Sequence, residues 1–250
     1  MWGNGDGTYL GFFKKGICYG IRRGLYGPNA SSKTYISYLR KKGAEIGEGT
    51  HFFNPRSVTI TTNEAYLLTI GKNCQITGGV SILTHDYGWS VTKAVYGDVL
   101  GSIREVVIGD NVYIGMNATI IAGVHIGNNV VIGANSLVSN DIPDNCVAVG
   151  NPCRVIYSLE EYHKRRKEAQ LEEAVMLIKA YYKRYDCKPP ISIMREHFWL
   201  FANKKEDLPE LFINQNNLIS GSEERTWQNF ESHIPMFPGY DAFVEYARNF

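Results

Sequence analysis

One short stretch of the sequence combines residue types suited to proton transfer and sugar binding. His85 is followed by Asp86, and Tyr87, Trp89 and Tyr96 come soon after it. Histidine side chains in general have a pKa of about 6.5, so most are uncharged near neutral pH and can accept a proton. Aromatic rings stack on the apolar faces of sugars, and a carboxylate accepts hydrogen bonds from sugar hydroxyls. The stretch therefore predicts a general base, His85. Beside it, Asp86, Tyr87, Trp89 and Tyr96 are expected to bind the sugar whose hydroxyl loses its proton, which we call the acceptor.

A histidine that acts as a base usually needs a partner to fix its orientation. Asp86 and Glu105 are candidates because they lie near His85 in the sequence, and Glu64 is a third because it replaces an apolar residue of the repeat described below. Asp86 could equally cap the turn that follows His85. The sequence leaves these alternatives open.

A repeat of six residues must position this stretch. Bulky apolar residues recur at that interval in one register before His85 and in a second register after it. The first register contains Ile46, Phe52, Val58, Ile70, Ile76 and Ile82, and the second contains Ile108, Ile114, Ile120, Ile126, Ile132 and Val138. Neither the helical period of 3.6 residues nor simple strand alternation explains this spacing. A triangular coil with one short strand per face does, so we expect an all-β solenoid, a parallel β-helix with an aliphatic core.

The break between the registers divides the chain further. It runs from 86 to 107, and we expect an inserted loop there, because long interruptions of compact repeats are usually functional. The solenoid itself should span 44–156. We expect residues 1–43 to form an N-terminal helical cap, with a helix over 31–42. An α-helical C-terminal extension should occupy 157–250. Its first helix should begin at 158–161 and end at 188–190, and a second helix should span 191–202. The remainder from 203 should contain an Asn-rich loop and a short final helix after Gly239.

Composition narrows the classes of function. Lys and Arg number 26 and Asp and Glu 25, so the balance does not predict nucleic-acid binding. Several basic residues nevertheless precede the repeat, and they form either a solvated face or a contact with an anionic membrane surface or polymer. They are Lys14, Lys15, Arg22, Arg23, Lys33, Arg40, Lys41 and Lys42. The five cysteines form no CxxC pair, and no signal peptide or membrane-spanning segment is evident, so we expect free thiols and a cytoplasmic location.

Four segments, ILTHDYGWSV, VYGDVLGS, IGMNATIIAGV and GNPCRVI, resemble the hexapeptide-repeat acyltransferases. This group includes the maltose, galactoside and serine acetyltransferases, and the resemblance is greatest to bacterial enzymes that acetylate capsule, lipopolysaccharide or related glycans. It covers about 44–156. The resemblance implies a left-handed β-helix, a homotrimer, acetyl-CoA as co-substrate without a metal, and His85 as the base that takes the proton of the acceptor hydroxyl.

The resemblance also implies where acetyl-CoA binds, namely along the C-terminal coils between neighbouring subunits. Ala134, Ser139 and Asn140 match small residues and a cofactor-contacting pair, and Arg154 matches an arginine that meets the nucleotide phosphates. Two departures matter. Asn140 stands where lysine is common, so phosphate contacts must be weaker or come from elsewhere, and Tyr113 stands where the galactoside enzymes carry a tryptophan near the reacting site.

The predicted function is therefore acetyl-CoA-dependent O-acetylation of a sugar hydroxyl, in a capsular or cell-surface polysaccharide or its precursor. N-acetylation of an amino sugar or of a xenobiotic is the alternative within the same class. A non-enzymatic assembly module would leave the loop after His85 unexplained. A γ-type carbonic anhydrase is disfavoured because it needs three histidines around zinc, whereas His51, His85 and His125 are isolated in the sequence.

Overall fold

The computed structural model describes residues 24–218 and 223–250, so Lys14, Lys15, Arg22 and Arg23 of the basic region, and Cys18, lie outside the described residues. The chain divides into two compact units, one up to Leu159 and one from Glu160 to Phe250. Among the described helices, none is both long and apolar enough to cross a membrane. The four cysteines of the described chain are free thiols, three of them buried.

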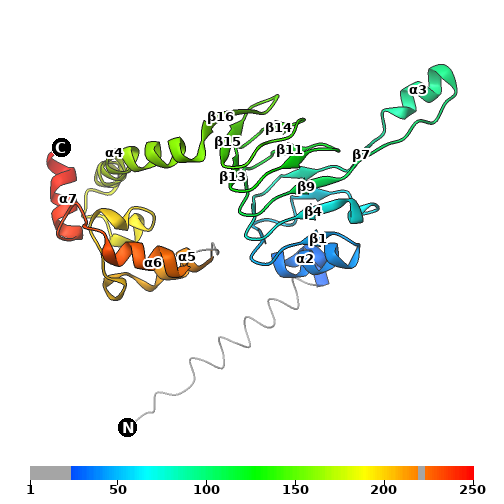
Figure 1. Ribbon diagram of the computed structural model, residues 1–250. Helices are drawn as coiled ribbons and strands as arrows, with labels where there is room; N and C mark the ends of the chain where they lie inside the picture. Colours follow the sequence, from blue (N-terminus) through cyan, green and yellow to red (C-terminus); the bar gives the residue numbers. More distant parts are fainter. Residues whose placement is uncertain (1–23, 219–222) are drawn as a thin grey trace, which may run out of the picture. The chain divides into compact units, whose positions relative to one another are not determined.

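The first unit is a parallel β-helix with three faces (Figure 1). The first face contains β1 (Glu45–Ile46), β4 (Leu68–Ile70), β9 (Val106–Ile108) and β12 (His125–Ile126). The second contains β2 (His51–Phe52), β5 (Gln75–Ile76), β10 (Tyr113–Ile114), β13 (Val130–Ile132), β15 (Cys146–Val149) and the antiparallel β16 (Arg154–Ser158). The third contains β3 (Thr59–Ile60), β6 (Ser81–Ile82), β11 (Thr119–Ile120) and β14 (Leu137–Val138). The left-handed winding stays a prediction from the resemblance.

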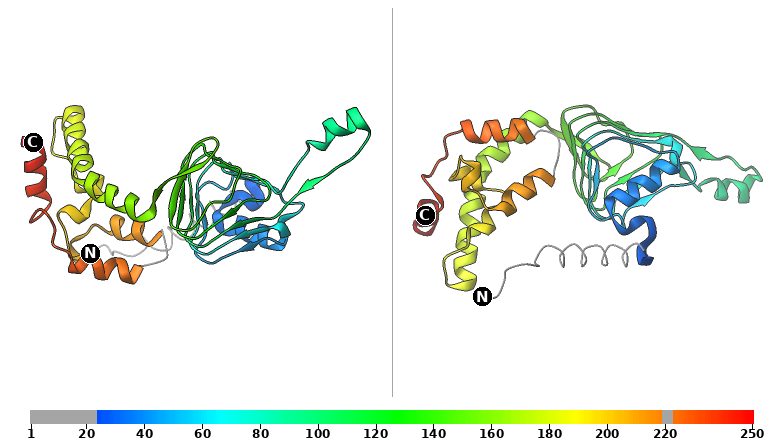
Figure 2. Two further views of the ribbon diagram at one scale, coloured as in Figure 1. Left: turned by 45° about the horizontal axis from the view of Figure 1, so that its top comes forward. Right: turned by 90° about the horizontal axis from the view of Figure 1, so that it is seen from below.

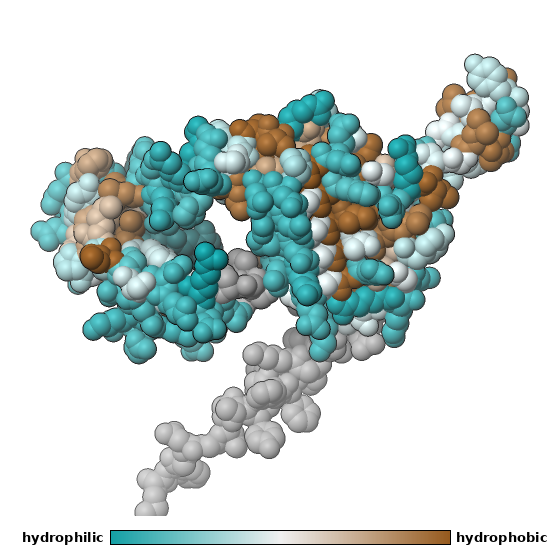
Figure 3. All heavy atoms as spheres, in the orientation of Figure 1, coloured by the Kyte–Doolittle hydropathy of each residue, from teal (hydrophilic) through white to brown (hydrophobic). Residues whose placement is uncertain are grey.

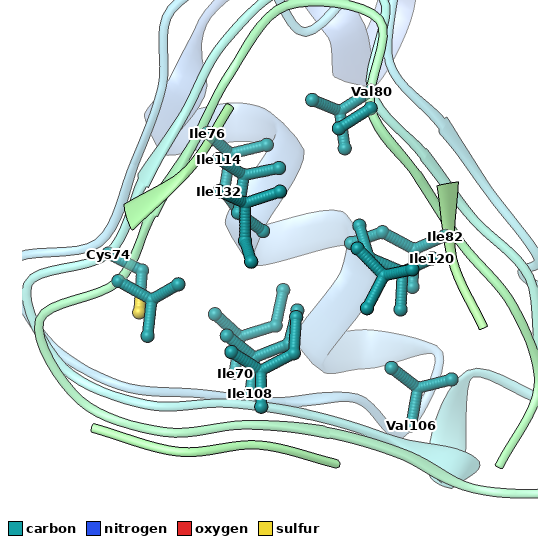
Figure 4. Packing of buried hydrophobic residues seen from close by; sticks show 14 of the residues in the cluster. Ile70, Cys74, Ile76, Val80, Ile82, Val106, Ile108, Ile114, Ile120 and Ile132 are labelled. Atoms are coloured by element: carbon teal, nitrogen blue, oxygen red, sulfur yellow. The ribbon is translucent and has the colours of Figure 1, made fainter. Parts of the chain in front are cut away.

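Aliphatic side chains stack in columns inside the triangle (Figure 4). Ile76, Ile114 and Ile132 form one such column, because their strands pair in register. Val58 is buried in the core, as its apolar position in the repeat predicts, but Ile60, and not Val58, stacks on Ile82. The spacing is eight residues from Phe52 to Ile60 and ten from Ile60 to Ile70. Because these two steps add up to a multiple of six, Ile70 stays in the same register as Phe52 and the irregular spacing is not visible in the sequence.

Asparagines hold the corner between the first and second faces. Asn111, Asn129 and Asn145 have φ values of 56°, 55° and 56° there, a left-handed conformation that Asn tolerates better than other non-glycine residues. Their side chains also join the coils, since Asn111 Nδ2 donates to Asn129 Oδ1 and Asn129 Nδ2 to Asn145 Oδ1, each at 2.9 Å. The glycine that follows the isoleucine in many repeats is required for a different reason, namely the close approach of neighbouring coils. A Cβ on Gly71 would lie 2.5 Å from the Gly109 carbonyl oxygen of the next coil.

A helix covers the first coil. The short 3-10 turn η1 (Gly27–Ala30) leads into α2 (Ser32–Lys41), and Ser31 and Thr34 form a reciprocal capping box at its start. Tyr35 and Leu39 project from α2 into the solenoid core, where the Tyr35 ring meets Phe52 edge-on at 5.2 Å. Burial, with a smaller effect of Tyr38, raises the pKa of Tyr35 to about 12.

The predicted loop at 86–107 has regular structure. It projects from the solenoid as an arm (Figures 1 and 2). A two-stranded antiparallel ribbon of β7 (His85–Asp86) and β8 (Ser102–Ile103) forms its base, and α3 (Trp89–Tyr96) lies beyond. The arm exposes several large apolar side chains (Figure 3). They are Tyr87, Val91, Val95, Tyr96, Val99, Leu100 and Ile103.

The second unit is helical and has its own core. Its helices are α4 (Leu159–Tyr185), α5 (Glu210–Leu218), α6 (Glu223–Ser232) and α7 (Tyr240–Asn249), with 3-10 turns η3 (Ile191–Met194), η4 (Phe198–Leu200) and η5 (Lys205–Asp207). Two predictions here were wrong. The helix expected over 191–202 is two separate 3-10 turns, which place Met194, Phe198 and Leu200 in the core. The Asn-rich segment is helical in α5, where burial of Phe212 overrides the weak helix propensity of Asn.

The asparagine corner yields a stability prediction. Asn129→Ala should lower the free energy of unfolding by about 2–4 kcal/mol, because it puts alanine in the left-handed region and removes two side-chain hydrogen bonds. Asn129→Gly should cost less, since it removes only the hydrogen bonds. Asn63→Ala, at an exposed position outside the left-handed region, is the control and should change stability by less than about 0.5 kcal/mol. Urea denaturation measures all three, and equal losses for the three variants would contradict the assignment.

Candidate functional site

His85 lies at the corner between the third and first faces, where the chain leaves the solenoid to form the arm. Thr84 and Arg104 close the base of the arm, because the Arg104 backbone N–H donates to the Thr84 carbonyl at 2.9 Å. His85 itself pairs with Ile103 across the ribbon. The backbone of His85 is therefore fixed by strand pairing at the base of the arm.

The structure identifies Glu64 as the partner of this histidine. Glu64 Oε2 lies 3.3 Å from His85 Nδ1, and the two side chains are only 24% and 20% exposed. Both atoms are buried and neither makes a well-aligned hydrogen bond, so the pair is at ion-pair distance with an imperfect angle. Catalytic hydrogen bonds are often poorly aligned until substrate is bound. With Nδ1 turned to the carboxylate, Nε2 is the ring nitrogen left to take a proton.

The two other candidates have different partners. Asp86 Oδ1 accepts a hydrogen bond from the Gly88 N–H at 2.8 Å, so Asp86 caps the turn into α3. This bond, with one from Ser102, lowers the pKa of Asp86, so the carboxylate is ionised. Glu105 Oε1 lies 3.5 Å from His125 Nε2, in a pair more than half exposed.

The aromatic residues of the arm fall into two groups. The Tyr87 ring meets the His85 ring edge-on at 5.2 Å, and the Trp89 ring lies 6.0 Å from Tyr87. Tyr96 stands at the opposite end of α3 and is 76% exposed. The structure thus gathers His85, Tyr87 and Trp89, while Tyr96 is separated from them by the length of the helix.

A buried hydroxyl group beside His85 was not predicted. Thr84 is fully buried, and its Oγ1 has no hydrogen-bond partner among the described residues. Its backbone N–H reaches Thr61 Oγ1 at 3.5 Å. The only available signal was a threonine at the inward position before His85, which is too common in strands to single out.

The residues expected to hold acetyl-CoA lie at four places in one chain. Ser139 and Asn140 follow β14 at the same corner as His85, two coils further along, and Asn140 Nδ2 donates to Ser139 Oγ at 3.2 Å. Tyr113 lies on the second face and is 41% exposed. Ala134 occupies the corner between the second and third faces. Arg154 begins β16, and its Nη1 donates to the Cys153 carbonyl at 2.8 Å.

A groove beside α2 is the other candidate binding site, and it lies away from His85. A groove of about 870 Å³ runs between α2 and the first coil, lined in part by Lys33, Arg40, Glu48 and His51. Burial lowers the pKa of His51, which favours its neutral form. Within residues 24–218 and 223–250, no three His, Cys, Asp or Glu side chains gather as a metal site would require.

Comparison with known proteins places the repeat in a family. The model of the bacterial transferase hexapeptide (six repeats) matches residues 105–140. Protein CapG of Staphylococcus aureus is 41% identical over 127 residues, which cover 51% of this chain and 73% of that protein. Galactoside O-acetyltransferase of Escherichia coli strain K12 is 37% identical over 145 residues, covering 56% of this chain and 66% of that protein. A solved maltose O-acetyltransferase from Clostridium difficile 630 is 27% identical, with a TM-score of 0.42 and coverage of 60% and 88%.

The Glu64 contact predicts the tautomer of His85. In ¹⁵N NMR spectra of the neutral imidazole, the proton should reside on Nδ1, because the carboxylate accepts it. Glu64→Ala should shift His85 toward the other tautomer. Glu105→Ala should leave it unchanged, because Glu105 pairs with His125. If Glu64→Ala left the tautomer as it was, the pairing would be wrong.

Proposed function

The chain belongs to the hexapeptide-repeat acetyltransferases, and from that premise we propose that it transfers the acetyl group of acetyl-CoA to a sugar hydroxyl of a cell-surface glycan or its precursor. The observation that carries the proposal is the pair of Glu64 and His85 at the base of an aromatic arm. The name of the galactoside O-acetyltransferase relative supports a sugar as acceptor. We also propose a cytoplasmic location, which is supported by the absence of a disulfide among the described cysteines.

His85 acts in this proposal as a general base. Its Nε2 takes the proton of the acceptor hydroxyl as the oxygen bonds to the thioester carbonyl carbon, and the same proton then passes to the departing thiolate of coenzyme A. Glu64 holds the tautomer with a free Nε2 and stabilises the imidazolium that forms. A base so placed contributes roughly 10²–10⁴ in rate.

The acceptor is proposed to lie against the arm. Tyr87 and Trp89 present rings next to His85, so a sugar stacked there would bring one hydroxyl to Nε2. The Asp86 carboxylate accepts hydrogen bonds from Gly88 and Ser102, but it is exposed and has further lone pairs for a neighbouring sugar hydroxyl. Tyr96 can contribute only to a longer acceptor, because it lies at the other end of α3.

Acetyl-CoA is proposed to bind Tyr113, Ala134, Ser139, Asn140 and Arg154. The fit is supported by the exposed guanidinium of Arg154, which uses Nη1 for the Cys153 carbonyl and has further N–H groups to offer phosphate. Ser139 and Asn140 share the corner of His85 and can reach the acetyl end. Bound acetyl-CoA supplies an activated thioester.

We also propose a homotrimer. The arm exposes Val91, Val95, Val99 and Leu100 at 60% or more, which is unfavourable unless another surface covers them. In one chain Tyr113 and Arg154 lie on a different face from His85, so a site shared between copies would bring the two sets together. A head-to-tail contact of this kind closes into a ring.

The trimer can be tested through the arm. Multi-angle light scattering should give three times the 28.2 kDa chain mass. Val95→Asp should shift the mass toward the monomer, because it buries a charge in the interface. Ile234→Asp, at an apolar residue of the second unit that is 92% exposed, is the control. A fully active wild-type monomer would refute the shared site.

His85→Ala is the central test of the proposed function. Release of coenzyme A should be measured across a panel of sugars, oligosaccharides and amino sugars, with the product identified as ester or amide. We expect at least a hundredfold loss of turnover, an unchanged KM for acetyl-CoA and a melting temperature within a few degrees of the wild type. His125→Ala is the matched control, as its imidazole is exposed and paired with Glu105. Retained turnover in His85→Ala would overturn the catalytic role.

A further inference from the structure

The groove between α2 and the first coil has walls that are fixed before any ligand binds. Figure 2 shows α2 lying against the first coil of the solenoid. At the start of α2, Ser32 Oγ accepts a hydrogen bond from the Phe52 N–H at 3.0 Å. Near its end, Arg40 Nε donates to the Ile46 carbonyl at 3.1 Å, and Nη2 donates to the same oxygen. Because both ends of the helix are tied to the coil, the groove is preformed, as sites for small molecules usually are.

One side of α2 supplies cationic and hydroxyl groups to this groove. Lys33, Ser37 and Lys41 follow one another at intervals of four residues, and Arg40 stands next to Lys41, so all four lie along one face of the helix. Their side chains are exposed. The residues by which α2 packs into the solenoid core are different ones. Core packing therefore does not account for this polar face.

The charges that line the groove are unequal in number. Among the described residues of the lining, Glu48 is the single carboxylate, against the three cations Lys33, Arg40 and Lys41. None of these four side chains forms an ion pair within the described part of the chain. His51 also lines the groove, but burial lowers its pKa, so its ring is a neutral hydrogen-bonding group. The lining thus has two positive charges in excess.

The charged residues next to the lining do not cancel this excess. Lys42 and Glu45 follow Lys41 along the chain, neither of them lines the groove, and their charges offset each other. Lys42 Nζ lies 5.9 Å from the centre of the Tyr38 ring. Lys72 takes the position of Glu48 in the second coil, because Ile70 pairs in register with Ile46, and it adds a positive charge.

A phosphate monoester matches this excess better than a carboxylate does. It carries a charge of roughly −1.5 to −2 near pH 7 and has three acceptor oxygens, whereas a carboxylate has a single charge. Guanidinium and ammonium groups are the usual partners of phosphate, and Arg40 keeps Nη1 for this use because Nε and Nη2 are bonded to the Ile46 carbonyl. The volume of about 870 Å³ exceeds that of a phosphate ion and suits a larger molecule that carries one.

We propose that the groove between α2 and the first coil binds the phosphate monoester of a larger molecule, either a soluble sugar phosphate or a lipid headgroup. Lys33 and Lys41 are about 12 Å apart along the helix at 1.5 Å per residue, so their long side chains can close from both sides on a phosphate beside Ser37. Arg40 would hold the phosphate through Nη1. The inference goes beyond the proposed function, because the groove and His85 occupy different corners of the solenoid.

Binding without acetyl-CoA tests the groove directly. The full chain is titrated calorimetrically with glucose 6-phosphate, glucuronate and glucose, which share a sugar ring and differ in charge. It is also sedimented with phosphatidylcholine vesicles that contain or lack phosphatidic acid, a phosphate monoester. We expect glucose 6-phosphate to bind at least tenfold more tightly than glucuronate, or phosphatidic acid to raise vesicle binding at least tenfold. The arm that binds identifies the source of the phosphate.

Single charge changes locate the binding in the groove. Lys33→Gln and Lys41→Gln should each weaken binding at least fivefold, because each removes a charge-assisted hydrogen bond. Lys42→Gln is the matched control, since it removes the same charge from the adjacent residue outside the lining, and it should change binding less than twofold. Glu48→Gln should strengthen binding about threefold, because it removes the only carboxylate of the described lining.

Three results would overturn the proposal. One is an equal loss in Lys41→Gln and Lys42→Gln, because the overall charge of the chain would then explain the binding. The second is binding of glucuronate as tight as that of glucose 6-phosphate, and the third is no binding in either arm. A gain of affinity in Glu48→Gln cannot arise from misfolding, and melting temperatures within a few degrees of the wild type confirm that the lysine variants are folded. None of these measurements depends on acetyl transfer.

Discussion

The stacking of coils at a fixed spacing constrains the whole first unit. Each coil must turn at three corners and still present its strands in register with the coil below. The corners use left-handed backbone, and at the corner between the first and second faces Asn111, Asn129 and Asn145 adopt it while their amides link one coil to the next. The aliphatic columns follow from this, because register at the corners places isoleucine above isoleucine on each face. Side-chain packing and corner geometry thus support the same arrangement.

The same constraint explains where the reactive residues lie. A corner is the one place where chain can leave a coil and return without disturbing a sheet, provided that its two ends are closed by pairing. Thr84 and Arg104 supply that closure, and His85 sits directly beyond it. Glu64 comes from the same corner of the preceding coil, so the pair joins residues from two levels of the solenoid. A proton acceptor held in this way needs little rearrangement before it acts.

Much of this was predictable from the sequence, and the failures have physical causes. The six-residue period reports inward-facing positions directly, so the solenoid was predictable. Two irregular spacings in the first coil put Ile60 outside the six-residue register, so its place on Ile82 could not be predicted, although Val58 in that register is also buried. Glu64 could only be one of three candidates, because a contact between coils depends on the distance between them and leaves no local pattern. The arm was expected as a loop, since α3 has only eight residues and three of them, Val91, Thr92 and Val95, are β-branched and weak helix formers. In the second unit, burial of Phe198, Phe212 and their neighbours overrides local propensity, so the extents of its helices could not be read from periodicity.

The two ends of the solenoid bear on its behaviour at high concentration. A parallel β-helix is an open stack, and each terminal coil presents unpaired backbone groups on which another stack could grow. Here α2 lies across the first coil with Tyr35 and Leu39 inserted into it. At the other end β16 reverses direction and pairs antiparallel with β15, so no further parallel strand can continue that face in register. These terminations oppose end-to-end fibre growth and allow the protein to carry a long exposed β-structure without becoming a filament.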